Sequence, residues 1–169
     1  EVVVSGDTAE TKLFISDDYG NVYSQSQADD FEVVIGGLSN PNALSYSDSD
    51  GGGDGQLYIA DAGNNQIIRT DPTDATPVQE LVSSGLTGPQ SVVVNSDATE
   101  LYNTDFSSQV YGTSLTTWAD LPNFPSTTSF GSGGYTEGGL VLGSGINASG
   151  ADDYLYASNY STGEIYKID

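Results

Sequence analysis

The feature that most constrains this chain is an internal repeat. Four segments match one another, and each opens with a leucine and an aromatic residue and reaches Asp or Asn four residues after that leucine. They are LFISDDYGNVYSQ from Leu13, LYIADAGNNQIIRTD from Leu57, LYNTDFSSQVYGTS from Leu101 and LYASNYSTGEIYKID from Leu155. The leucines are 44, 44 and 54 residues apart. Similar segments at such spacings predict four repeated structural units.

The connecting segments repeat as well. GGLSNPNALSYS from Gly36 aligns with SGLTGPQSVVVN from Ser84, and VVVSGDTAETKLFISD from Val2 matches VVVNSDATELYNTD from Val92. Alternating apolar and polar residues, β-branched residues and turn clusters of Gly, Asn, Asp and Ser indicate short strands and no helix. Units of about 40 to 45 residues with four strands each are typical of β-propeller blades.

The expected fold is therefore an all-β propeller of four blades, each a four-stranded antiparallel sheet, in a single domain. The blades are predicted at about residues 1–40, 41–88, 89–137 and 138–169. The fourth blade is expected to lack its outer strand, because the sequence stops after Tyr166-Lys167-Ile168-Asp169, and no spare strand is expected before Val2. Its outer edge would then be unpaired, and natural proteins pair or cover such edges.

Three segments carry a resemblance to a known family. At LYIADAGNNQIIRTD, and at GLSNP from Gly37 and GLTGP from Gly85, the chain resembles NHL-repeat propellers and related secreted six-bladed propellers. The resemblance implies the propeller fold much more than an activity, because those relatives include binding modules, lyases and lactonases. Rings of this kind usually have six or more blades, whereas four are visible here.

Composition removes several classes of function. The 169 residues include 24 Asp and Glu, three Lys and Arg, and no His, Cys or Met, for a net charge of −21. We expect no nucleic-acid partner, because phosphates would be repelled, and no apolar run is long enough for a membrane span. Without His and Cys, catalysis would depend on carboxylates, hydroxyls or a hard cation. The acidity and the lack of oxidisable sulfur predict a secreted, extracellular protein.

Four equivalent polar residues form one candidate metal site. Asp17, Asp61, Asp105 and Asn159 end the second strand of each repeat, so symmetry would place four oxygens on one rim of the propeller. Ca²⁺ prefers such oxygen ligands. The alternative, which repetition in every blade favours, is that each side chain accepts backbone N–H groups of its own turn.

A second candidate for Ca²⁺ is the loop DSDGGGDG, which contains Asp48, Asp50 and Asp54. It resembles the Asp-rich calcium loops of some extracellular propellers, which have ligands at loop positions 1, 3, 5 and 9. Here Gly52 stands at position 5 and the next Asp at position 7, so the pattern is broken. The alternative is a flexible acidic hairpin in which glycine supplies positive φ. The sequence requires no other cofactor.

Several residues are predicted to contact partners. Trp118, placed in the outer strand of the third blade, and Phe124 and Phe130, in a Pro- and Ser-rich connection, depart from the repeat and are expected to form a contact surface. Ile165 and Ile168 are expected to contribute from the last strand. Aromatic residues within strands are predicted to pack between blades rather than to bind sugars. Two N-glycosylation sequons, at Asn147 and Asn159, are no more than composition accounts for.

The predicted function is that of a non-catalytic structural or adhesive module outside the cell. A strand from another copy or from continuing chain would add to the bare edge of the fourth blade by β-augmentation. The expected partner is therefore a further copy or another extracellular protein. Head-to-tail addition without closure would build a filament. Two alternatives stay open. One is a metal-dependent hydrolase similar to propeller lactonases, although no glutamate beyond Glu1 stands in the first inner strand. The other is a calcium-dependent sugar-binding module.

Overall fold

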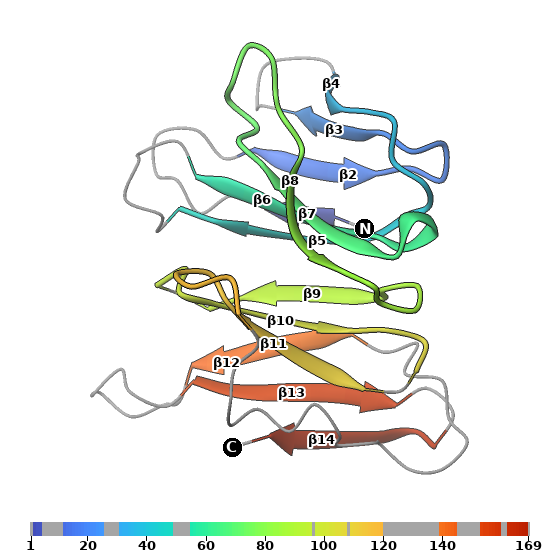
Figure 1. The fold of residues 1–169 in the computed structure, drawn as a ribbon, viewed down its shortest axis with the longest axis vertical. Helices are drawn as coiled ribbons and strands as arrows, with labels where there is room; N and C mark the ends of the chain where they lie inside the picture. Colours follow the sequence, from blue (N-terminus) through green and yellow to red (C-terminus); the bar gives the residue numbers. More distant parts are fainter. Residues whose placement is uncertain are drawn as a thin grey trace.

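The four repeats form four antiparallel sheets that follow one another in chain order (Figure 1). The computed structural model describes residues 2–4, 12–25, 31–48, 55–95, 97–107, 109–119, 139–144, 153–159 and 162–168. The regular elements in these residues are strands and one turn of 3₁₀ helix, Ala62–Asn64. No helix in the described part of the chain is both long and apolar enough to cross a membrane. The prediction of an all-β fold with four blades is confirmed.

Each sheet is a simple meander in which successive strands are neighbours. The first sheet contains β1 (Val2–Val4), β2 (Leu13–Ser16), β3 (Val22–Gln25) and β4 (Glu32–Ile35). The second contains β5 (Pro41–Ser47), β6 (Gln56–Asp61), β7 (Gln66–Thr70) and β8 (Glu80–Ser84). The third contains β9 (Ser91–Val94), β10 (Glu100–Thr104) and β11 (Val110–Ser114). The fourth contains β12 (Leu140–Ser144), β13 (Asp153–Asn159) and β14 (Glu164–Ile168).

The third sheet has three described strands, one fewer than predicted. A turn follows β11 directly, because the Trp118 N–H donates to the Ser114 carbonyl at 2.8 Å. Trp118 also has a φ of 59°, which a strand does not allow. The expectation that Trp118 lies in an outer strand is therefore wrong. Residues 120–138, where a fourth strand would have to follow, lie outside the described residues.

The register makes the sheets equivalent position by position, and alternation of side chains gives each sheet two faces. The rear face carries the repeated leucines, and the front face carries the aromatic residue after each of them. The rear-face leucines are Leu13, Leu57, Leu101 and Leu155, and the front-face aromatics are Phe14, Tyr58, Tyr102 and Tyr156. The front face of one sheet packs against the rear face of the next.

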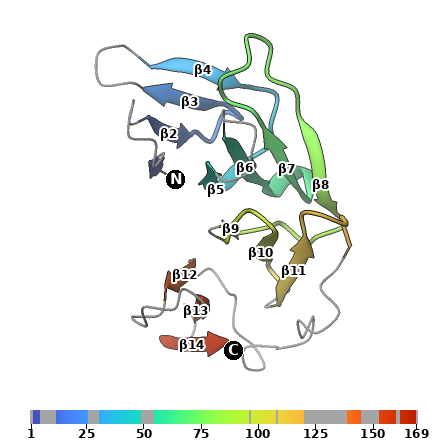
Figure 2. The same ribbon diagram turned by 90° about the vertical axis from the view of Figure 1, so that its left-hand side faces the viewer.

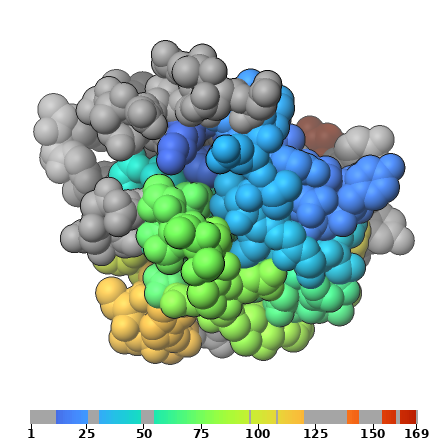
Figure 3. Space-filling model, turned by 90° about the horizontal axis from the view of Figure 1, so that it is seen from above, coloured from blue at the N-terminus to red at the C-terminus, as the bar shows by residue number. Residues whose placement is uncertain are grey.

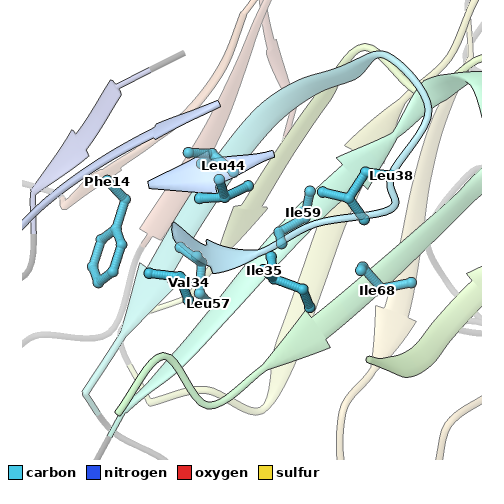
Figure 4. Packing of buried hydrophobic residues seen from close by; sticks show 9 residues of the cluster. Phe14, Val34, Ile35, Leu38, Leu44, Leu57, Ile59 and Ile68 are labelled. Carbon is cyan, nitrogen blue, oxygen red and sulfur yellow. The ribbon is translucent and has the colours of Figure 1, made fainter. Parts of the chain in front are cut away.

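The core therefore lies between successive sheets. Phe14, on the front face of the first sheet, packs in one cluster with Leu44, Leu57 and Ile59 of the second (Figure 4). A second cluster joins the second and third sheets, and a third joins the third and fourth. Their main contributors are Tyr58 and Ile67 with Val92 and Leu101, and Val93 and Val110 with Leu155 and Ala157. Burying each such side chain contributes about 1.5 to 3 kcal/mol, so an inner sheet depends on both neighbours.

The sheets are arranged along an arc. Figure 2 shows β1, β5, β9 and β12 on the inner side of the curve, with the first and fourth sheets at its two ends. The end formed by the first sheet exposes β3, β4 and the connection between β7 and β8 (Figure 3). Val33 of β4, Leu81 of β8 and Val78 in that connection are each more than half exposed. Isolated apolar side chains of this kind are ordinary on a protein surface.

The connection from the first sheet into the second packs closely against Gly20. Gly20 has a φ of 88°, and its carbonyl accepts the Leu38 N–H at 3.1 Å. A methyl group on Gly20 would collide with the Leu38 carbonyl oxygen. Gly37 also has positive φ, 79°, but a methyl group there would meet no atom within 4 Å. Substitutions at the two glycines therefore separate the cost of a positive φ, which both positions share, from the cost of a collision, which only residue 20 has.

We expect Gly20→Ala to lower the free energy of unfolding by about 3 kcal/mol, through the left-handed backbone, the collision and the weakened hydrogen bond. Gly37→Ala should cost about 1 kcal/mol, because only the backbone conformation is unfavourable. Urea unfolding of both variants measures the difference. Equal losses of unfolding free energy in the two variants would show that the connection shifts to accommodate the added methyl group at residue 20.

Candidate functional site

The four rim residues occupy equivalent places in the four sheets. Asp17 and Asp105 directly follow β2 and β10, and Asp61 and Asn159 are the last residues of β6 and β13. Asp61, Asp105 and Asn159 are at most 1% exposed, whereas Asp17 is half-buried. Each side chain accepts hydrogen bonds. The rim is thus a row of hydrogen-bond acceptors, three of them buried. Their role depends on which groups donate to them.

Asp61 connects two sheets. Its Oδ1 accepts the Ser39 N–H at 2.7 Å, and its Oδ2 accepts the side-chain amides of Asn64 at 2.7 Å and Gln66 at 2.9 Å. Ser39 belongs to the connection that leaves the first sheet, so the carboxylate fixes the chain as it enters the second. An acceptor surrounded only by donors satisfies all of them as a carboxylate.

Asp105 repeats this arrangement one sheet later. Its Oδ2 accepts the Thr87 N–H at 2.9 Å, and Thr87 has the same place in GLTGP that Ser39 has in GLSNP. Its Oδ1 accepts the Ser107 N–H at 2.9 Å and the Ser107 hydroxyl. The Tyr111 hydroxyl also donates to Oδ2 at 3.2 Å. The repeat thus includes a hydrogen bond between sheets, in addition to bonds within the turn.

Asp17 and Asn159, in the end sheets, each accept backbone N–H groups of their own turns. Asp17 Oδ1 accepts the N–H groups of Tyr19 at 3.0 Å and Asn21 at 2.8 Å, and its Oδ2 accepts the Tyr23 hydroxyl at 3.0 Å. Asn159 Oδ1 accepts the Thr162 N–H at 3.2 Å. These geometries are those of the turn interpretation, in which each side chain serves its own hairpin.

Hydrogen bonding and burial at this rim shift the pKa values of three groups away from neutral pH. The Asn21 N–H is the main cause that lowers the pKa of the Asp17 carboxyl. The bond to Asp17 raises the pKa of the Tyr23 hydroxyl, and burial is the main cause that raises the pKa of the Tyr111 hydroxyl. These three groups therefore keep one protonation state near pH 7, which does not suit a general acid or base.

The structure brings no carboxylates together as a metal site in the part of the chain that it describes. No group of three Asp or Glu residues there is placed to hold an ion. Asp48 is exposed and directly follows β5, whereas Asp50 and Asp54 lie outside the described residues. Ca²⁺ binding by the DSDGGGDG loop remains a prediction.

A groove that the sequence analysis missed follows the inner strands. It has a volume of about 640 Å³ and is lined by residues of β5, β9 and β12 together with Gln90 and Gly139. Its polar side chains connect neighbouring sheets, since Ser45 Oγ accepts the Val94 N–H at 3.2 Å and Ser91 Oγ accepts the Leu140 N–H at 3.0 Å. These two serines thus have a structural use. The sequence signal for this groove is the repeat itself, because β5, β9 and β12 are the first strands of successive repeats and are expected to lie side by side around the propeller axis.

Trp118 bridges two sheets instead of standing free. Its ring lies under the Arg69 guanidinium, with 4.7 Å from Arg69 Cζ to the ring centroid, and Arg69 Nε also donates to Glu80 at 2.8 Å. The indole is 45% exposed, so part of it is accessible. The other residues predicted with it, Phe124 and Phe130, and the sequon residue Asn147 lie outside the described residues.

The fourth sheet separates the two isoleucines predicted to contact partners. Ile168 is partly buried and packs toward the third sheet with Leu155. Ile165 is on the opposite face and is 74% exposed, and Val141 of β12 on that face is 58% exposed. The front face of this sheet thus has two accessible apolar side chains.

Asn103 is a buried polar residue that the sequence analysis missed. It is 0% exposed, and neither its Oδ1 nor its Nδ2 has a hydrogen-bond partner. The equivalent residue in the second sheet is Ile59 and in the fourth Ala157. The repeat alignment contained the signal, because a polar residue stands where the other rear faces are apolar.

Comparisons with known proteins support the fold. A chain in the crystal structure of a nidogen/laminin complex matches with a TM-score of 0.59 and 15% identity, over 94% of this chain and 71% of that one. An auxiliary nutrient-binding protein from Bacteroides thetaiotaomicron matches with a TM-score of 0.63 and 15% identity, over 97% of this chain. This chain spans 40% of the nutrient-binding protein. No family profile and no curated protein sequence matches, so the NHL resemblance stays a prediction.

Proposed function

We propose that this chain is a non-catalytic, extracellular structural or adhesive module that associates through its fourth sheet with further copies of itself or with another extracellular protein. The observation that carries the proposal is the edge of that sheet. Among the described strands, β14 pairs with β13 alone, so its other side presents backbone donors and acceptors. An added strand would satisfy them by β-augmentation.

The rim supports a non-catalytic role. The carboxylates of Asp61 and Asp105 are buried and already bonded to backbone and side-chain donors. Carboxylates used in this way are poor candidates for the cation of a lactonase-like hydrolase, because a metal would have to displace these donors. The extracellular assignment is supported by composition, since a chain with charge −21 is best screened in a salt-containing medium.

Proline substitution in β14 tests the edge. Residues in an antiparallel pair alternate between hydrogen-bonded and non-hydrogen-bonded positions, so of two adjacent residues one directs its N–H away from β13. Lys167→Pro and Ile168→Pro therefore form a matched pair. The variant that loses a bond to β13 should melt at a lower temperature. The other should keep a nearly unchanged melting temperature but lose an outward donor.

Sedimentation velocity, from low to high micromolar concentration, gives the readout. We expect the wild-type chain to associate and the stable proline variant to associate less. A wild-type chain that stays monomeric throughout would contradict self-association. Equal association of the wild type and the stable proline variant would show that the edge of β14 is not the contact.

A further inference from the structure

In the part of the chain that the structure describes, no sheet packs on the front face of the fourth sheet, whereas the next sheet packs on the front face of each of the other three. Opposite Ser16, Ala60, Thr104 and Ser158, the third strands carry Val22, Ile67, Val110 and Ile165, respectively. The first three are 0% exposed because the next sheet packs on them, whereas Ile165 is 74% exposed. The same position is therefore a core residue in three sheets and a surface residue in the fourth.

The innermost strand shows the same difference. Val93 of β9 and Val141 of β12 pair with equivalent tyrosines, Tyr102 and Tyr156. Val93 is 9% exposed and packs against Leu155 of the following sheet, but Val141 is 58% exposed. Two apolar positions of this face, on the strands at either side of β13, are thus accessible, and we call them together the front patch (Val141 and Ile165).

At the other end of the arc, the rear face of the first sheet is incompletely covered. Leu13 and Ile15 are half-buried there. The equivalent Leu57 and Ile59 in the second sheet are 0% exposed, because they pack on the front face of the first. We call Leu13 and Ile15 the rear patch. The rear patch belongs to a rear face, and front faces pack on rear faces at the three junctions between sheets of this chain.

We propose that the front patch binds the rear patch of a second copy of this chain. This inference rests on the proposed function and names the surface through which copies associate. The contact would continue the sheet-to-sheet packing already made between the first and second, second and third, and third and fourth sheets. The two patches lie at opposite ends of the arc (Figures 1 and 2), so the contact is head-to-tail.

Charge also favours this occupant. The chain has a net charge of −21, and Lys167, one of its three basic residues, is exposed on the same face as Ile165. A positive charge beside the patch reduces repulsion between two acidic copies at the place of contact.

Blocking variants test the head-to-tail contact. Ile165→Lys removes the front patch and keeps the rear patch, and Leu13→Glu does the reverse. Each variant alone should be monomeric, with a dissociation constant weakened by about thirtyfold or more, as for a central interface residue. Mixed in equal amounts, the two variants retain one intact pair of patches and should form a one-to-one dimer that cannot grow.

Two controls accompany the blocking variants. Leu81→Lys is the matched control, because Leu81 is 57% exposed but belongs to β8 of the second sheet and to neither patch. It should associate like the wild type. Thermal melting verifies that each variant folds, and Val141→Lys and Ile15→Glu replace any variant that does not.

The outcomes distinguish this inference from the proposed function. A dimer that forms only in the mixture supports it. A mixture that stays monomeric overturns it. If both blocking variants still associate but the stable β14 proline variant does not, copies join at the strand edge, so the proposed function stands and this inference fails. If the wild type itself is monomeric at every concentration, both self-association proposals fail.

Discussion

Asp61→Ala should lower the free energy of unfolding by about 4 kcal/mol, because three donors lose their acceptor in a buried place. The Ser39 N–H and the amides of Asn64 and Gln66 all donate to this carboxylate, which is 0% exposed. Removing the carboxylate also releases the connection that joins the first two sheets. Urea unfolding followed by circular dichroism measures the loss.

Two further variants separate the causes. Asp61→Asn keeps the shape but presents an amide to donors, so its loss should be intermediate. Asp17→Ala, at the equivalent place in the first sheet, should cost much less, since its partners Tyr19 and Asn21 belong to its own partly exposed turn. If Asp61→Ala lowered the free energy of unfolding no more than Asp17→Ala, the hydrogen bond from Ser39 would not contribute to stability. If its loss vanished in EDTA, a bound cation would explain it instead.

The contrast between Asp61 and Asp17 shows what could be predicted from the sequence. Equivalent positions for the four rim residues followed from the repeat, because spacing fixes the end of each second strand. The bond from Ser39 to Asp61 did not follow, because it joins residues 22 apart whose approach depends on packing between two sheets. Local turn chemistry predicts donors within the same hairpin, and Asp17 has such donors.

The third sheet marks another limit. Trp118 is expected in the outer strand of the third blade, but the turn after Ser114 and the contact with Arg69 determine its position. A cation–π contact between two sheets leaves no periodic signal in the sequence. Likewise, the repeat aligns Ile165 with Val22, Ile67 and Val110, and alignment alone cannot say whether a further sheet covers it.

Leu57→Ala should lower the free energy of unfolding by about 4 kcal/mol, within the range for a fully buried leucine. Leu57 is 0% exposed between the first and second sheets, where Phe14, Leu44 and Ile59 surround it in one cluster. The cavity would lie between two sheets that depend on each other, so neither collapses easily. Leu101→Ala, equally buried between the second and third sheets, should cost a similar amount.

Leu13→Ala is the informative comparison for Leu57→Ala, because the two leucines are equivalent and only their cover differs. In a monomer, Leu13→Ala should lower the free energy of unfolding by about 1 kcal/mol, because the half-buried Leu13 removes less apolar surface from water on folding than Leu57 does. If copies bind head-to-tail, Leu13 becomes buried, and its cost should rise with protein concentration while that of Leu57→Ala does not. Chemical unfolding of both variants at low and high protein concentration measures the two costs. A Leu13→Ala cost that is independent of concentration, in a wild-type chain that does associate, would place the contact elsewhere.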